Sequence, residues 1–169
     1  MDLSNFQCPD SRTDLFVRED LLCGRNVTYE IHGSIPRFVE SNNYASAFGL
    51  QWNTFSRTQF DSFTGQPITE KRLEAAFGHS LSDLKGKKVL EAGSGAGRFT
   101  EILLKYGAIV YSFDYSNAVE ANFANNTPNK NLTVFQADIA NIPFRSSFFD
   151  AVVCLGVLQH TPSLSLIHI

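Results

Sequence analysis

The stretch KKVLEAGSGAGRFT, residues 87–100, decides the fold of this chain. Its apolar run at residues 89–92 predicts a buried strand. A tight glycine-rich turn follows at residues 93–97, and residues 98–106 then place apolar side chains at helical spacing. A strand, a glycine turn and a helix in this order aim a helix N-terminus and bare backbone N–H groups at a ligand. Glycine suits the turn because a Cβ would block close approach or forbid the backbone angles.

The spacing of the glycines bears on whether the turn binds a dinucleotide. A dinucleotide site carries G-x-G-x-x-G, whereas this turn has Gly93, Gly95 and Gly97, and Arg98 follows. An acidic residue, Glu91, lies on the strand just before the turn. The spacing disfavours a dinucleotide, and a glycine-rich turn that binds nothing stays open as an alternative on this motif alone.

The rest of the chain continues the alternation of strands and helices. Apolar runs predict strands at residues 108–113, 132–136 and 148–155, and the last of these is apolar enough to be buried on both faces. Ser116 is a good N-cap for a helix that runs to about residue 125. Alternation of this kind predicts an α/β fold with a Rossmann-like, doubly wound and mainly parallel sheet.

Acidic residues stand where two of these strands end. Asp114 lies at the end of the strand after the glycine turn, where a carboxylate can accept hydrogen bonds from both hydroxyls of a ribose; the alternative is a surface Asp that caps a loop. The next residue, Tyr115, can lie against an adenine ring. Asp138 ends the third strand, and its alternative role is an Asx turn before Pro143.

Four motifs in this order resemble class I S-adenosylmethionine (AdoMet) methyltransferases of the type 11 kind: EAGSGAG, Asp114, QADIANIPF around Asp138, and FFDAVVCLGVLQH. The resemblance runs from about Cys8 to Ser163. It implies about four of the seven strands of that fold, in the order 3-2-1-4, AdoMet as the cofactor, and methyl transfer as the reaction. It implies cofactor contacts by Glu91, Gly93, Ser94, Gly95, Gly97, Asp114, Tyr115, Asp138, Ile139 and Leu155.

The chemistry expected of such a site is mild, because the sulfonium already makes the methyl group electrophilic and the protein mainly holds donor and acceptor in line. His160 is the candidate general base, although it can equally line the cofactor pocket or cap a helix. Cys154 is expected in the core. The acceptor, small molecule or macromolecule, is not specified. Two alternatives stay open: an inert or regulatory AdoMet-binding half-domain, and an NAD-dependent reductase, which the glycine spacing disfavours.

Residues 1–40, irregular and polar up to Ile31, resemble the small zinc-ribbon-like module found ahead of some bacterial methyltransferases. In that pattern two C-x-x-C pairs bind one metal. The pairs here read Cys8–Ser11 and Asp20–Cys23, so half the thiolates are absent. Two thiolates, an Asp and a Ser make a poor tetrahedral zinc site. We therefore expect a degenerate module without a metal.

Residues 41–80 are rich in aromatic side chains, and we expect them to pack a helical lid onto the methyltransferase core at residues 81–163. A sharper alternative is that Arg57, Thr58 or Gln59 reaches the methionine end of the cofactor.

The composition of the chain bears on nucleic-acid binding, membrane insertion and location. The chain has 169 residues, 43% hydrophobic and 18% charged, with a net charge of −3, so a general nucleic-acid surface is not expected. It has no apolar run of membrane-spanning length and no visible secretion signal, and its three scattered cysteines fit a cytoplasmic location.

The C-terminal residues 164–169, LSLIHI, resemble the translation of a transposon-end sequence used in sequencing libraries. We expect them to be non-native and the fourth strand to lack its natural cover; the alternative is a genuine short C-terminus. A chain in that state would be aggregation-prone and inactive, since an unpaired apolar edge favours self-association.

Overall fold

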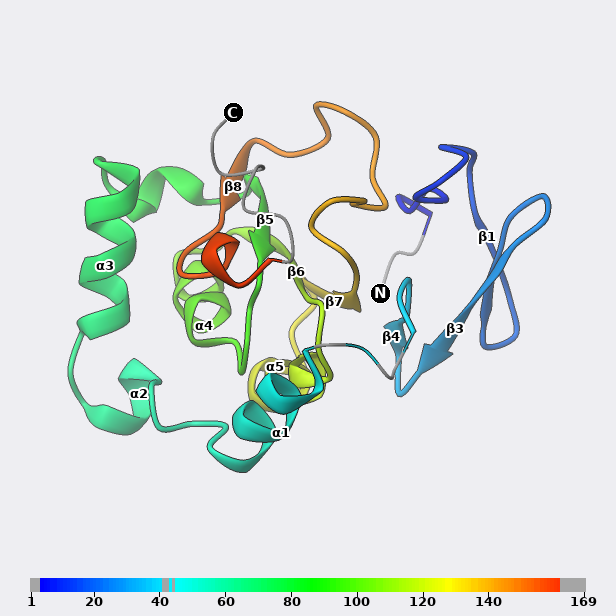
Figure 1. Ribbon diagram of the computed structural model, residues 1–169. Coiled ribbons are helices and arrows are strands. Elements are labelled where there is room, and N and C mark those ends of the chain that lie inside the picture. The colour runs from blue at the N-terminus through cyan, green and yellow to red at the C-terminus, as the bar shows by residue number, and fades with distance from the viewer. Residues whose placement is uncertain (1–3, 41–42, 44, 162–169) are drawn as a thin grey trace.

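The structure, a computed structural model, describes residues 4–40, 43 and 45–161 (Figure 1). The predicted tail at residues 164–169 lies outside this part of the chain. Four short strands come first and form an antiparallel sheet in the order β1-β2-β3-β4. They are β1 (Phe16–Arg18), β2 (Leu21–Cys23), β3 (Thr28–His32) and β4 (Ile35–Pro36).

A second, parallel sheet lies between the N-terminal strands and the helices (Figure 1). Its strands are β5 (Lys88–Ala92), β6 (Ile109–Asp114), β7 (Leu132–Gln136) and β8 (Ala151–Val153). The helices are α1 (Ser46–Thr54), α2 (Asp61–Thr64), α3 (Ile68–Phe77), α4 (Arg98–Lys105) and α5 (Ala118–Asn126), with 3₁₀ turns η1 (Leu81–Leu84) and η2 (Leu158–His160).

The order of the parallel strands, β7-β6-β5-β8, is the predicted order 3-2-1-4. The α/β fold class is confirmed. The fourth strand differs from its prediction, because only Ala151–Val153 pair with β5 and the flanking apolar residues do not. Burial on both faces is also wrong for this strand, since Val152 is 61% exposed.

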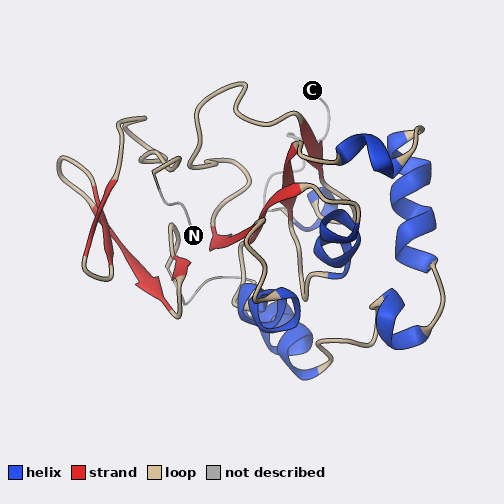
Figure 2. Cartoon of the chain, turned by 180° about the vertical axis from the view of Figure 1, so that it is seen from behind, coloured by secondary structure: helices blue, strands red, loops and turns tan. Residues whose placement is uncertain are grey.

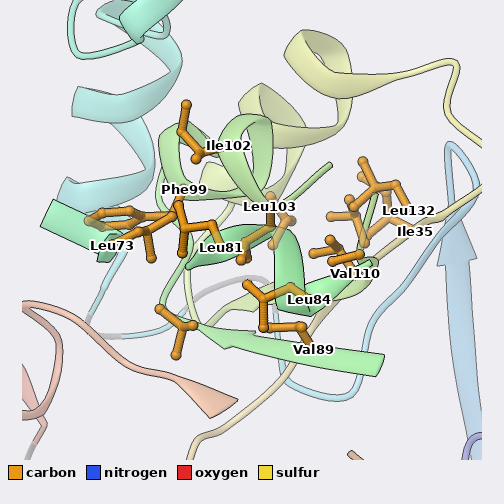
Figure 3. Close-up of a cluster of buried hydrophobic side chains, with 14 residues drawn as sticks. Ile35, Leu73, Leu81, Leu84, Val89, Phe99, Ile102, Leu103, Val110 and Leu132 are labelled. Carbon is orange, nitrogen blue, oxygen red and sulfur yellow. The ribbon is translucent and has the colours of Figure 1, made fainter. Parts of the chain in front are cut away.

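One face of the parallel sheet carries the aliphatic core (Figure 3). Alternate residues of the strands, such as Val89 and Val110, point toward α4 and meet Phe99, Ile102 and Leu103. The amphipathic spacing along α4 puts these three side chains on one stripe, and all three are buried. α3 and η1 close this layer with Leu73, Leu81 and Leu84.

The other face of the sheet is covered by the N-terminal strands and by the loop between β7 and β8 (Figure 2). Aromatic rings fill this layer: Phe6 lies 5.2 Å from Phe135 and 4.7 Å from Phe144 between ring centroids, and Phe113 stacks on Phe135 at 5.2 Å. A doubly wound sheet usually has helices on both faces. Here an antiparallel sheet and an aromatic loop replace the second layer of helices.

The N-terminal strands correct the expectation that the chain is irregular up to Ile31. The side chains of β1 are all exposed, so this strand carries no alternation of apolar and polar residues that a sequence pattern would reveal. The antiparallel sheet is joined to the parallel sheet by the residues that follow β4. The backbone N–H of Phe38 donates to the carbonyl of Gln136 at 2.8 Å, and Arg37 and Gln136 form a parallel bridge.

Hydrogen bonds also join the N-terminal segment to the loop after β7. Arg12 donates from its guanidinium to the carbonyl of Ile142 at 2.8 Å and to the side-chain oxygen of Asn141 at 3.2 Å. Asn141 in turn donates to Asp10 at 2.8 Å. The loop that follows Asp138 is therefore held from the N-terminal side. Among the described residues, no helix is long and apolar enough to cross a membrane.

Candidate functional site

A cavity of about 300 Å³ lies at the carboxyl ends of the parallel strands. The glycine turn after β5 contributes to its wall, and so do the last residue of β6 and the residue after it, two residues that follow β7, and the segment between β8 and η2. β6 and β8 lie on opposite sides of β5, so the strand order reverses at this point. Ligands of open α/β sheets bind at such a switch point.

Most of the residues that the sequence singled out come together here. The lining includes Gly93, Ser94, Gly95, Asp114, Tyr115, Asp138, Ile139, Leu155 and His160. Glu91 and Gly97 are not part of the lining. The structure thus brings the ends of four strands together around one cavity and places the two remaining predicted residues behind its wall.

Asp114 ties the end of β6 to the glycine turn. Its Oδ2 accepts a hydrogen bond from the backbone N–H of Gly95 at 2.9 Å, and its Oδ1 accepts from the backbone and hydroxyl of Ser116 at 2.9 and 2.7 Å. The loop-capping role that was open from sequence is therefore present. A carboxylate offers about four acceptor sites, so Asp114 keeps acceptor capacity toward the cavity that it lines.

The glycine turn is pinned to the neighbouring strand by its own backbone. The N–H groups of Gly93 and Ser94 both donate to the carbonyl of Phe113, at 2.8 and 2.9 Å, and the N–H of Gly97 donates to Ser94 at 3.0 Å. Together with the bond from Gly95 to Asp114, these contacts occupy four N–H groups of the turn. The prediction of bare N–H groups is wrong for these four residues. These four residues therefore allow close approach of a ligand but offer it no free N–H donor.

Two glycines of the turn face residues that cover it. Gly95 has a φ of +53°, and a Cβ there would lie 3.2 Å from the indole of Trp52, which comes from α1. A Cβ at Gly93 would lie 2.2 Å from the side chain of Val157, just after β8. The turn therefore lies beneath Trp52 and Val157, and a side chain at either glycine would displace one of them.

Gly97 has a different role, which explains its place outside the cavity. Its φ is +91°, and a Cβ there would lie 2.2 Å from Oδ1 of Asn122 on α5. Asn126, one turn further along α5, donates to the Gly97 carbonyl at 3.1 Å. Gly97 thus lets α4 and α5 approach, with two amide side chains against its backbone.

Glu91 is buried behind the turn, 1% exposed. Its Oε2 accepts hydrogen bonds from the hydroxyls of Thr100 and Ser112, the latter at 2.8 Å, while Oε1 has no partner among the described residues. Burial raises the pKa of Glu91 to about 7, because the charged form loses hydration that two hydroxyls only partly replace. Glu91 therefore joins β5, β6 and α4 as a buried acid.

Asp138 and Tyr115 are each held by their neighbours. Oδ1 of Asp138 accepts from the backbone N–H of Ala140 at 2.8 Å, so the Asx turn that was open from sequence is present beside the cavity. The Tyr115 carbonyl accepts from the Gln136 amide at 2.9 Å, and Gln136 in turn accepts from Arg37 at 3.0 Å. This relay connects the N-terminal sheet to the cavity wall.

The lid predicted at residues 41–80 is helical, and part of its aromatic content packs as expected. Phe60 is buried with Ala96, and Trp52 packs against that cluster. Phe55 and Phe63 are instead 56% and 63% exposed. Of the three residues predicted to reach the cofactor, Gln59 lines the cavity, while Arg57 and Thr58 do not.

Sequence reasoning missed several lining residues. They are Ala45, Phe48, Gln51, Trp52, Phe55, Ser56, Phe60, Arg72, Ala96, Arg98, Phe99, Gly156, Val157 and Thr161. Arg98 and Phe99 follow the glycine turn directly, so their position at the start of α4 was an available signal. Arg72 comes from α3, and no local pattern points it at this cavity. His160 lies 5.2 Å from the ring of Phe48 between centroids, on the lid side of the cavity.

Cys8 and Ser11, the first pair of the degenerate zinc-ribbon pattern, form hydrogen bonds within the N-terminal segment. The Cys8 sulfur lies 3.4 Å from the hydroxyl of Tyr29 and accepts from the backbone N–H of Ser11 at 3.5 Å. Cys154, expected in the core, is partly buried, and burial raises the pKa of its thiol. Within residues 4–40, 43 and 45–161, no group of three His, Cys, Asp or Glu side chains is placed to hold a metal ion.

A family model described as "Methyltransferase domain" matches residues 90–167. The matched residues contain the glycine turn, Asp114, Asp138 and the segment after β8, which are the parts that form the cavity. This match agrees with the resemblance of the chain to class I AdoMet-dependent methyltransferases. The cofactor of this family is AdoMet, as the sequence resemblance implied. A zinc-ribbon identity for residues 1–40 remains a prediction.

Two curated relatives resemble this chain over part of their length. A ubiquinone biosynthesis O-methyltransferase of Coxiella burnetii is 36% identical over 81 residues, which are 47% of this chain and 35% of the relative. An uncharacterized chloroplastic methyltransferase of Arabidopsis thaliana is 33% identical over 110 residues, 60% of this chain and 31% of the relative. The chain thus spans about a third of the length of the curated relatives it matches.

A similar solved structure comes from Methanococcus maripaludis and is described as a candidate AdoMet-dependent methyltransferase. Its TM-score is 0.56 at 20% identity, over 75% of this chain and 57% of that one. At 20% identity, this likeness supports the fold of the chain and nothing beyond the fold. The family match and the structural likeness therefore both agree with the fold of the chain.

Proposed function

We propose that this chain binds AdoMet in the cavity at the strand ends and transfers its methyl group to an acceptor. The observation that carries the proposal is the meeting of Asp114, Asp138 and the glycine turn around one cavity, within the span of the family match. A carboxylate at the end of the strand after a glycine turn suits ribose hydroxyls. The residues present therefore fit a nucleoside that carries an amino-acid chain.

The chain's own residues bind and orient the ligand. Asp114 accepts hydrogen bonds from ribose hydroxyls with the capacity that its internal bonds leave. Asp138 accepts from the adenine amino group, and the backbone of Ile139 contacts the ring. Tyr115 covers one face of the base. Trp52, packed over Gly95, excludes water from the methyl end.

AdoMet, when bound, supplies an electrophilic methyl group, so alignment of the acceptor is the main demand on the protein. A general base is needed only for an acceptor that must lose a proton. His160 lines the cavity beside Phe48 and is the residue that would accept that proton. The Coxiella relative is named as an O-methyltransferase, which favours a hydroxyl acceptor here and hence this use of His160.

Isothermal titration tests the proposal. We expect AdoMet and S-adenosylhomocysteine to bind with one site per chain, and NAD to show no binding at the same concentrations. Binding of NAD in place of AdoMet would contradict the proposal and support the reductase alternative. Binding of AdoMet without methyl transfer to any hydroxyl, amine or carboxylate acceptor, measured with tritiated methyl donor, would support a binding half-domain instead.

A further inference from the structure

Two arginines from different helices flank one aromatic ring in the cavity wall. The guanidinium carbon of Arg98, at the start of α4, lies 4.6 Å from the centroid of the Phe99 ring, and that of Arg72, on α3, lies 5.8 Å from the same centroid. All three side chains line the cavity. The cavity therefore has a cationic end, on the side of α3 and α4.

Neither guanidinium forms an ion pair within the part of the chain that the structure describes. Among the described residues, no ion pair and no hydrogen bond involves the side chain of Arg72 or Arg98, although other arginines of the chain form such contacts. Arg98 is partly buried, and its burial and the charge of Arg72 lower its pKa, while Glu91 and Asp61 act in the opposite direction. Arg72 is exposed at the same wall, so an anion that contacts both arginines would offset the hydration that Arg98 loses.

The two acids that act electrostatically on Arg98, Asp61 and Glu91, form hydrogen bonds elsewhere. Asp61 accepts hydrogen bonds from the backbone N–H groups of Thr69 and Glu70, both at 2.9 Å, and so caps α3. Glu91 is buried and bonded to Thr100 and Ser112. The chain thus leaves the arginine pair open toward the cavity, where an external anion can reach it.

The charge of the cofactor decides which molecule brings that anion. AdoMet carries a carboxylate, an ammonium and a sulfonium, and so has one net positive charge. The lining already holds two arginines against two carboxylates, those of Asp114 and Asp138. Binding AdoMet therefore leaves the cavity with an excess positive charge. An acceptor that carries a negative group would balance it.

We propose that Arg72 and Arg98 bind an acidic group, a carboxylate or a phosphate, of the methyl acceptor. This inference rests on the proposed function. Arginine suits the role because its planar fork of donors matches carboxylate and phosphate oxygens. The cationic end then sets the acceptor's orientation, with its acid on the arginine pair and its methyl-accepting atom toward the sulfonium.

Titrations with paired small molecules test the inference. Phenyl phosphate and benzoate are compared with the neutral benzamide, on the protein saturated with S-adenosylhomocysteine and on the protein alone. We expect the two anions to bind at least about tenfold more tightly than benzamide, in line with charge-assisted hydrogen bonds. Arg72→Gln and Arg98→Gln should each reduce anion affinity by about tenfold. Arg57→Gln, which removes the same charge from an exposed residue outside the lining, should leave anion affinity unchanged.

Two results would overturn the inference. The first is equal affinity for benzoate and benzamide. The second is a loss of S-adenosylhomocysteine affinity in the arginine variants while anion binding stays the same, because the pair would then serve the cofactor's own carboxylate. Failure of the proposed function would give a different result. The unmodified protein would then not bind AdoMet, and anion titrations of the protein alone would still measure binding to the arginine pair.

Discussion

Gly95 and Asp114 are joined by a hydrogen bond of 2.9 Å from the backbone N–H of the glycine to Oδ2 of the carboxylate. The bond links the turn after β5 to the end of β6, so the residue expected to hold the ribose also fixes the turn on which we expect the cofactor to rest. Binding and local rigidity are therefore coupled at this site, and a substitution of Asp114 affects both.

Replacing Asp114 by Ala should weaken AdoMet binding by about 1.5–3 kcal/mol, since charge-assisted hydrogen bonds to the ligand are lost. The free energy of unfolding should fall as well, because the N–H of Gly95 and the backbone N–H of Ser116 lose their acceptor. Titration calorimetry and urea unfolding measure the two effects. Asp150→Ala is the matched control: its carboxylate accepts from the backbone N–H of Lys88 at 2.8 Å, at the opposite end of β5. An equal loss of affinity in both variants would contradict this account of Asp114.

Replacing Gly95 by Val should abolish AdoMet binding. The residue has a φ of +53°, and its Cβ would press on the indole of Trp52 at 3.2 Å, so the turn and the lid cannot both keep their places. Gly78→Val imposes similar backbone strain, at a φ of +69°, with no atom within 4 Å of its Cβ. We expect the control to lose stability and to keep AdoMet affinity. Unchanged affinity in the Gly95 variant would show that the cofactor does not rest on the turn.

The stability of the fold should depend on pH through Glu91. Its pKa is raised from 4.5 to about 7 in the folded chain, so the folded state favours the protonated form. The stabilisation is full below pH 4.5 and is lost as the pH rises through about 7, by at most about 3 kcal/mol. Urea unfolding from pH 5 to 8 should give a flatter profile for Glu91→Gln than for the unmodified protein. The exposed Glu74→Gln serves as the control. Parallel profiles for Glu91→Gln and the unmodified protein would refute the raised pKa.

Arg12 should act on the cofactor site from a distance. It holds Asn141 and the carbonyl of Ile142, in the loop that follows Asp138. Arg12→Ala should reduce AdoMet affinity by about three- to tenfold, because the adenine side of the cavity loses a support worth about 1 kcal/mol. Arg18→Ala, on the exposed strand β1, removes the same charge without touching this loop. Equal affinities for the two variants would mean that the N-terminal segment does not position the site.

The parallel sheet and the strand-end residues were predictable because their signals are local. Apolar runs mark β5, β6 and β7, and the glycine turn marks where α4 begins. Asp114 and Asp138 follow directly from these strands, since carboxyl ends of neighbouring parallel strands meet at one edge. The central strand order was also expected, and the structure confirms it.

The remaining features depend on contacts between distant parts of the chain. The side chains of β1 are all exposed and β3 alternates over only five residues, so the apolar signal of these strands is weak. The N-terminal segment is docked by bonds such as Arg12 to Ile142, 130 residues apart. Arg72 reaches the cavity because α3 packs on α4. Gly97 matches the motif, yet its place is set by Asn122 on another helix. A linear pattern carries none of these relationships.

The most direct measurement of the central claim is a crystal structure of the chain with S-adenosylhomocysteine. The account predicts ribose hydroxyl oxygens within about 3 Å of the Asp114 carboxylate, the distance of a hydrogen bond. It also predicts the adenine ring beside Asp138 and Ile139 and the ligand's amino-acid chain along the turn at Gly95. A ligand bound away from Asp114, or no bound ligand at saturating concentration, would contradict it.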